Sequence, residues 1–170
     1  SARKIPSKLG REELLRVKLG KVGDREIAAP LPRGAGSITT LTRADGVVRI
    51  PSQSEGIEQG ARVTVDLLRP SSYIERTVVI IGSHDLTLDL LADELIPRNV
   101  FVASSHVGSL GGVLALRSDT AHIATSHLLD EDTGTYNWSY IKKYIPDSPV
   151  RLFHGVMREQ GFMVPKGNPK

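Results

Sequence analysis

Apolar and polar positions alternate with a period of two in the first part of the chain. Over residues 15–19 and 63–67, aliphatic side chains are separated by charged or hydroxyl-bearing ones. This period predicts half-buried β-strands. Two further apolar runs, 25–29 and 46–50, are bounded by the prolines and serines typical of turns. We therefore expect a small antiparallel β-barrel or sandwich, with one short helix over 37–44 that Ser37 would cap.

The pattern changes after Arg69-Pro70-Ser71-Ser72, which cannot easily continue a strand. Apolar runs now alternate with amphipathic segments, so we expect parallel strands joined by helices in an open α/β layer. The expected strands are 77–81, 99–103, 121–124 and 150–153, and the expected helices are 86–95, 109–116 and 136–145. The predicted fold class is α/β overall, with a β domain over 1–72 and an α/β lobe over 73–170.

Charge is divided unevenly between these two parts. Residues 1–72 hold 13 basic and 8 acidic residues, a net charge of +5, whereas residues 73–170 hold 9 and 11, a net charge of −2. The basic residues alternate with acidic ones, as on an ordinary solvated strand face. Aromatic residues make up only 5% of the chain, and no nucleic-acid-binding motif is present. A small anionic partner is thus favoured over nucleic acid.

Several classes of protein are excluded by what the sequence lacks. No apolar run approaches the roughly 20 residues of a membrane helix, and the first residues lack the apolar stretch of a secretory signal. With no cysteine, the chain can form neither disulfides nor thiolate metal sites. We expect a folded protein in the cytoplasm that does not bind a membrane.

Three successive apolar runs end in the same pair of residues, at Ser83-His84, Ser105-His106 and Ser126-His127. The carboxyl ends of parallel strands meet at one edge of a sheet, where ligands bind. Hydroxyl groups beside helix N-termini suit a small oxyanion, because the first backbone N–H groups of a helix have no partner. The glycines after the second pair let backbone approach a ligand. The predicted oxyanion-binding residues are Ser83, Ser104, Ser105, Gly108, Ser109 and Ser126.

Other interpretations of the same residues remain open. Each serine alone could cap a helix, and the glycine-rich turn could serve close packing of a helix on the sheet. His84, His106 and His127 could bind a metal only if their imidazoles converge, so we expect no metal site. A hydrolase that uses one of the Ser-His pairs ranks last, because sequence neighbours rarely reach the required geometry. We expect no catalytic residue in this chain.

The first part of the chain resembles the C-terminal domain of molybdopterin molybdotransferases, gephyrin-like proteins included. The likeness covers residues 3–68 and rests on the order and spacing of several short segments. They are Arg3-Lys4-Ile5, Gly10 to Val17, Gly34-Ala35-Gly36-Ser37, Arg43-Ala44-Asp45-Gly46 and Gly60 to Val65.

This resemblance implies an enzyme that inserts molybdate into adenylylated molybdopterin with magnesium. Its cleft would lie between the catalytic domain of one subunit and the present domain of the partner in a homodimer. Arg16 and Ser37 match positions that line the cleft, so Arg16, Gly36 and Ser37 are the expected cofactor-binding residues. Arg16 offers a planar set of donors for an oxyanion, and Ser37 offers a hydroxyl at a helix N-terminus.

Residues 77–170 resemble the periplasmic-binding-protein-like domain found fused behind molybdotransferase domains. The supporting segments are Ile81 to Asp85, Ser104 to Gly112, His127 to Asp130 and Arg158 to Pro165. Related folds bind molybdate or tungstate and also form the effector domains of LysR-type regulators. The ligand implied for this part is a small oxyanion.

The chain departs from these families in two ways. It contains no counterpart of the catalytic domain, so we expect transferase activity of the parent protein only and no cofactor requirement of this chain alone. It also stops near Pro165, where the crossover to a second lobe would begin, so only the first lobe is expected. An alternative is a non-enzymatic module that binds a small ligand and regulates a partner.

Overall fold

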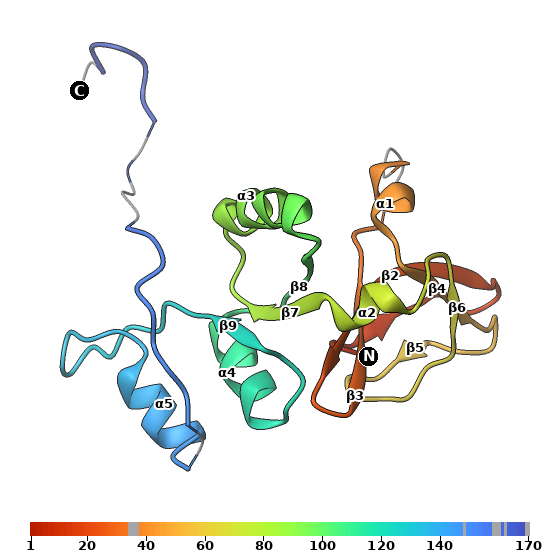
Figure 1. Ribbon diagram of the computed structural model, residues 1–170. Coiled ribbons are helices and arrows are strands. Elements are labelled where there is room, and N and C mark those ends of the chain that lie inside the picture. Colours follow the sequence, from red (N-terminus) through yellow and green to blue (C-terminus); the bar gives the residue numbers. More distant parts are fainter. Residues whose placement is uncertain (34–37, 148, 158–160, 162, 169–170) are drawn as a thin grey trace.

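The computed structural model describes residues 1–33, 38–147, 149–157, 161 and 163–168, and it has a mixed α/β architecture (Figure 1). The first half consists of β1 (Ile5–Pro6), β2 (Glu13–Val22), β3 (Arg25–Pro30), α1 (Ile38–Arg43), β4 (Gly46–Ile50), β5 (Gly56–Ile57), β6 (Val65–Leu67) and α2 (Ser72–Glu75). The second half consists of β7 (Thr77–Gly82), α3 (Leu86–Leu95), the 3-10 turn η1 (Ile96–Arg98), β8 (Phe101–His106), α4 (Ser109–Arg117), β9 (Ile123–Thr125) and α5 (Trp138–Tyr144).

The first half is an antiparallel sheet with the strand order β3-β2-β4-β6. A separate two-stranded ribbon of β1 and β5 contributes Ile5 and Ile57 to the apolar cluster on one face of this sheet. Leu15, Val17 and Ile50 from the sheet fill the same cluster. The predicted alternation is confirmed, but among the described residues β3 and β6 remain edge strands. The arrangement is therefore an open sheet with a packed ribbon, and the expected barrel does not close.

The hairpin of β2 and β3 is buried on both of its faces. Leu19 and Ala28 oppose each other on the face that packs into the first-half cluster. Ile27 and Ala29 point the other way, into a second cluster that also contains Ala103 of β8. This burial on both sides explains why Ile27 to Pro30 are all buried instead of alternating.

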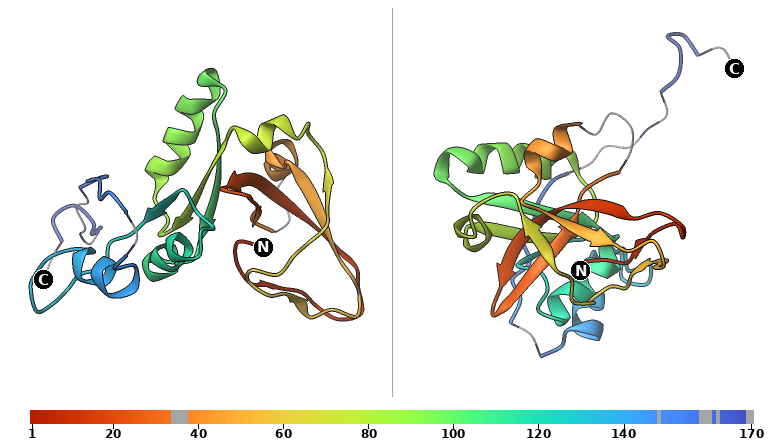
Figure 2. Two further views of the ribbon diagram at one scale, coloured as in Figure 1. Left: turned by 60° about the horizontal axis from the view of Figure 1, so that its bottom comes forward. Right: turned by 90° about the vertical axis from the view of Figure 1, so that its right-hand side faces the viewer.

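The second half is a parallel sheet with the order β8-β7-β9. The helices α3 and α4 lie on opposite faces of this sheet (Figures 1 and 2). Val113 and Ala115 of α4 are buried against it, whereas α3 has no buried residue. This alternation of strands and helices confirms the predicted α/β layer.

Glycine lets the two halves approach closely where β2 crosses β7. A Cβ atom on Gly20 would lie 2.5 Å from Cγ2 of Val79 and 3.1 Å from the carbonyl oxygen of Thr77. Nearby, the rings of Tyr73 and Phe101 stack with their centroids 4.7 Å apart. The chain passes from one core to the other between Ile74, which packs in the first-half cluster, and Val79.

One predicted strand is wrong. Residues 150–153 form no strand, and Leu152 and Phe153 are exposed by 53% and 80%. Apolar residues make a strand only when another strand offers hydrogen bonds, and this segment leads away from the folded body (Figure 1). β8 and β9 also each begin two residues later than expected. In the described part of the chain, no helix is long and apolar enough to cross a membrane.

Candidate binding edge of the parallel sheet

The three Ser-His pairs do meet at one edge of the parallel sheet. Gly82 at the end of β7 lies opposite His106 of β8 and Thr125 of β9. The backbone amides of Val107 and Gly108 both donate to the carbonyl oxygen of Gly82, at 3.0 and 3.1 Å. The expectation that these strand ends converge is therefore confirmed for the backbone.

Between β7 and β9 this edge is closed by direct hydrogen bonds. The amide of Ser83 donates to the carbonyl oxygen of Thr125 at 2.9 Å, and the Thr125 hydroxyl donates to the carbonyl oxygen of Ser83 at 2.6 Å. Ser126 donates through its hydroxyl to Oδ1 of Asn137 at 2.7 Å. The Ser126 hydroxyl is thus held by the loop before α5.

Asn137 was not anticipated as an organiser of this edge. Its Oδ1 atom also accepts from the amide of Leu128 at 2.8 Å, and its amide group donates to the carbonyl oxygen of Ser126 at 3.2 Å. Its backbone is left-handed, with a φ of 65°, which asparagine tolerates better than most residues. The helix expected over 136–145 included residue 137, so the sequence pattern did not indicate this role; α5 begins only at Trp138.

Gly108 and Ser109 form the start of α4. Gly108 precedes the helix with a φ of 79°, which favours glycine. Ser109 accepts through its hydroxyl from the amide of His127 at 3.1 Å, and the same oxygen lies 3.2 Å from Nδ1 of His127. Gly112 faces the sheet, where a Cβ would lie 2.6 Å from the carbonyl oxygen of Ile81. The glycine-rich turn therefore does serve close helix packing.

Ser104 and Ser105 lie on opposite faces of β8, because side chains alternate along a strand. Ser105 shares its face with Ala103 and is 3% exposed, and its hydroxyl has no hydrogen-bond partner in the described part of the chain. Ser104 is half-buried on the α3 side, opposite Ile80. The two neighbouring hydroxyls do not point into one common space.

The histidines of these pairs separate into two groups. The rings of His84 and His106 contact edge to face, with their centroids 4.3 Å apart, whereas His127 contacts Ser109. Burial lowers the pKa of His106 below its ordinary value, and the neighbouring His84 lowers it further. Among the described residues, no group of three or more His, Asp or Glu side chains is placed to hold a metal ion.

Asp85, which follows His84 in the sequence, has a structural role. Its carboxylate accepts from the amide of Thr87 at 2.9 Å and so caps α3. This contact uses Asp85 as an ordinary helix cap.

The second predicted site lies in the first half, at Arg16. Nη1 of Arg16 donates to the hydroxyl of Thr40 at 2.6 Å. Arg16 also lines a hollow of about 160 Å³, together with Leu14 and Arg33. Gly36 and Ser37, the other expected cofactor-binding residues, lie outside the described residues.

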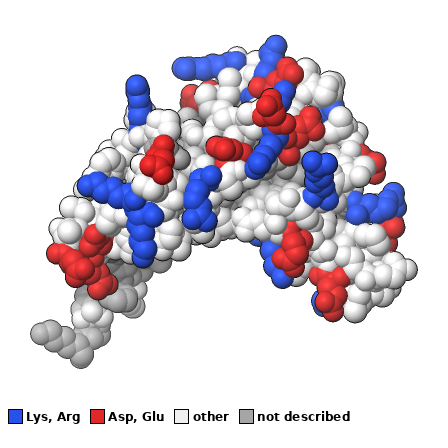
Figure 3. Space-filling view, turned by 90° about the horizontal axis from the view of Figure 1, so that it is seen from below, with Lys and Arg blue, Asp and Glu red and all other residues white. Residues whose placement is uncertain are grey.

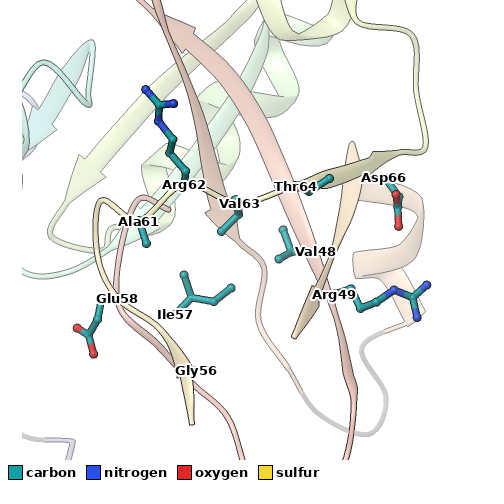
Figure 4. Close-up of a pocket in the computed structure, with 10 residues that line it drawn as sticks. All are labelled: Val48, Arg49, Gly56, Ile57, Glu58, Ala61, Arg62, Val63, Thr64 and Asp66. Atoms are coloured by element: carbon teal, nitrogen blue, oxygen red, sulfur yellow. The ribbon is translucent and has the colours of Figure 1, made fainter. Parts of the chain in front are cut away.

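A larger hollow, of about 560 Å³, lies between β4 and the segment that leads into β6, whose first residue pairs with Val48 (Figure 4). Val48, Ile57 and Val63 form its apolar floor, and charged residues such as Arg49 and Glu58 stand at its rim. It contains no predicted site residue. It could not be predicted from sequence patterns, because it arises where two paired segments diverge.

Charged side chains do not gather into a single patch near these sites. In Figure 3, Lys and Arg are interspersed with Asp and Glu over the face seen from below. Lys18 and Asp45, which are nearly buried, form an ion pair at 2.9 Å, and Arg33 pairs with Glu13 at 2.9 Å. The alternation of charge in the sequence is thus reproduced at the surface.

Two family models match different parts of the chain. Residues 1–68 match the MoeA C-terminal region (domain IV), and residues 92–170 match the PBP superfamily domain. No solved structure matches the chain.

Two curated relatives each match part of the chain. It is 33% identical over 98 residues to the uncharacterized protein YvgK of Bacillus subtilis, covering 56% of this chain and 31% of that protein. It is 39% identical over 67 residues to the putative molybdopterin biosynthesis protein MJ0666 of Methanocaldococcus jannaschii, covering 39% of this chain and 16% of that protein. The chain thus spans less than a third of either relative. In its first part it is similar to the MoeA C-terminal region and in its second part to the PBP superfamily domain, which confirms both resemblances predicted from the sequence.

Proposed function

We propose that this chain is an accessory part of a cytoplasmic molybdenum-cofactor biosynthesis protein, in which the first half borders a molybdopterin site and the second half holds a small oxyanion. The observation that carries the proposal is the match of residues 1–68 to the MoeA C-terminal region. A relative described as a putative molybdopterin biosynthesis protein supports it. In this proposal, the parent protein is a homodimeric molybdotransferase that uses magnesium and molybdate.

Arg16 is the residue through which the first half would contact the cofactor. Its guanidinium group lies at a hollow on the protein surface and is oriented by Thr40. A planar guanidinium can donate two parallel hydrogen bonds to a phosphate group, such as the one molybdopterin carries. Gly36 and Ser37, which lie outside the described residues, are the other cofactor contacts in this proposal.

Binding of molybdopterin to the chain tests this first part of the proposal. Arg16→Gln should weaken binding at least tenfold in a fluorescence titration, because about 1.5–3 kcal/mol is typical of a hydrogen bond to a charged group. Lys21→Gln is the matched control, since Lys21 is exposed on the same strand and the change in charge is equal. If wild type does not bind molybdopterin, or both variants bind alike, Arg16 has no role in the cofactor site.

The oxyanion would bind at the carboxyl edge of the parallel sheet, among the predicted residues. Ser105 is the member of this set that needs a partner: it lies four residues before α4 begins, and its hydroxyl, buried on the core side of β8, has no hydrogen-bond partner among the described residues. Buried polar groups rarely lack a partner, so an unpaired one is a reason to look for a ligand or a water molecule. Gly108 and Ser109 contribute an open helix N-terminus and a hydroxyl.

Calorimetric titration of the 170-residue chain with molybdate, tungstate, sulfate and phosphate tests this second part. Ser109→Ala and Ser105→Ala should each weaken molybdate binding. Ser118→Ala is the matched control, because Ser118 lies at the opposite end of α4, where it donates to the carbonyl oxygen of Leu114 at 3.0 Å. Absence of binding heat at millimolar molybdate would remove the oxyanion from the proposal and leave the cofactor-binding part unaffected.

A further inference from the structure

The N-terminal segment brings a positive charge to the parallel sheet. Ala2 donates its amide to the carbonyl oxygen of Ala28 on β3 at 2.8 Å, and it is buried in the same cluster as Ala103 of β8. Since β8 is the edge strand of its sheet, the next residue, Arg3, belongs to the junction between the halves. No predicted site includes Arg3.

The guanidinium group of Arg3 lacks a hydrogen bond at this junction. Its Nε atom is buried and has no hydrogen-bond partner among the described residues. The ion pairs found in the described part of the chain do not include Arg3. A guanidinium group has donors but no acceptor, so only an acceptor or an anion can complete its contacts. A buried cationic donor without a partner is costly, and a bound anion would remove that cost.

The charge of Arg3 acts on His106, and His106 in turn contacts His84. His106 ends β8 and contacts the ring of His84 at 4.3 Å. The pKa of His106 is lowered first by burial and then by His84, and the charge of Arg3 is close enough to lower it further. Asp89 on α3 is the one nearby acid that acts in the opposite direction on the pKa of His106. The surroundings of His106 therefore disfavour its protonated form, and a bound anion would stabilise that form.

We infer that Arg3, His84 and His106 form a binding site for a tetrahedral oxyanion at the junction between the two halves. This inference rests on the proposed oxyanion function and adds to it the charged groups that the serine edge lacks. Arg3 supplies a fork of N–H donors, and each imidazole supplies one N–H when neutral and two when protonated. Because Arg3 comes from the first half and both histidines from the second, the bound anion links the two halves.

The test is an anion titration of the 170-residue chain and of two charge-matched variants. Arg3→Gln should weaken molybdate binding at least tenfold. Lys4→Gln should leave binding unchanged, because Lys4 is exposed and pairs with Glu58 at 2.7 Å. Arg3→Lys should restore only part of the affinity, since an ammonium group lacks the planar fork. Phosphate and sulfate arms show whether the site distinguishes molybdate from other tetrahedral anions.

A second readout follows the histidines directly. In NMR titrations, molybdate should raise the pKa of His106 in the wild-type chain, because an anion favours the protonated imidazole. The increase should be absent in Arg3→Gln and present in Lys4→Gln. Should Arg3→Gln fail to fold, His106→Gln replaces it, since His106 is exposed and its loss should lower affinity without loss of structure.

The outcomes separate this inference from the function on which it rests. If molybdate binds, Ser109→Ala weakens it and Arg3→Gln does not, the serine edge is the oxyanion site and the inference is overturned. If no anion binds the wild-type chain, both proposals fall. Weak binding that is equal for all anions and all variants indicates an adventitious ion only and also overturns the inference.

Discussion

The two apolar cores of this protein are built differently. The core of the first half draws its buried residues from residues 5–74 alone. The core of the second half combines Val79, Ile81 and Ala103 with Ala2, Val22, Ile27 and Ala29 of the first half. The first core is thus independent of the parallel sheet, whereas the parallel sheet depends on the β2–β3 hairpin. Although the chain resembles two families, its two halves are therefore not independent folding units.

The largest effect should come from breaking the independent core. Ile50→Ala removes a side chain that is 0% exposed, and such truncations cost about 2–5 kcal/mol. Because the two cores share the β2–β3 hairpin, both halves should lose stability together. The test is urea unfolding. Circular dichroism follows the whole chain, and the fluorescence of Trp138, the only tryptophan, follows the second half.

Leu14→Ala is the control for this variant, because Leu14 is 59% exposed and its loss should cost little. The inference that the two halves unfold together would be wrong if Ile50→Ala lowered the urea midpoint measured by circular dichroism and left the midpoint measured by Trp138 fluorescence unchanged.

A change at the crossing of β2 and β7 should have the next largest effect. Gly20→Val places a branched side chain where even a Cβ would lie 2.5 Å from Val79, and overpacking costs about 1–3 kcal/mol. Amide hydrogen exchange should quicken in β7 and β8 more than in β4. Lys21→Val, at the exposed neighbouring position, should leave both rates nearly as they are.

Removal of the unpaired hydroxyl of Ser105 should increase stability, whereas the two changes above decrease it. Ser105→Ala should raise the free energy of unfolding by about 1 kcal/mol, because a buried polar group without a partner is destabilising. Ser104→Ala, on the half-buried face of the same strand, should be close to neutral. A loss of stability in Ser105→Ala would show that the hydroxyl has a partner and would weaken its assignment to a ligand site.

The smallest effect should be the response to pH. The pKa of His106 is lowered in the folded state, so the unfolded chain binds more protons once the pH falls below about 6.5, the ordinary histidine pKa. Stability is therefore fully present above that pH and decreases as the pH falls through the folded pKa. Solvent screening should keep the loss below about 0.5 kcal/mol. In thermal melts between pH 7 and 5, wild type should lose this stability as the pH falls, and His106→Gln should not.

Local sequence patterns were sufficient for most of the elements. The alternation at 15–19 follows from a strand with one buried face, and β2 includes it. The continuous burial of β3 could not be predicted, because its second face is covered by β8, which is more than 70 residues away. Residues 150–153 show the converse, since their apolar run has no neighbouring strand to pair with.

The candidate site was predictable only as far as backbone topology determines it. Parallel strands had to bring the Ser-His pairs to one edge, and they do. The direction of each hydroxyl depends on the residue at which its strand ends, and sequence patterns do not locate strand ends to the residue. Because β8 continues to His106, Ser105 remains inside the strand and faces the core, whereas Ser83 and Ser126 lie beyond their strands. Arg3 was missed because its neighbours come from the other half.

The passage between the halves also bears on how proteases would cut this chain. Although Arg69 and Arg76 flank it, Arg69 donates to the carbonyl oxygen of Ala44 at 3.2 Å, and Ile74 anchors the passage in the first core. Proteases cut preferentially where the backbone is exposed and not held by such contacts. Trypsin should therefore cut first at Arg151, in an exposed segment, and release a fragment in which the two halves are still joined.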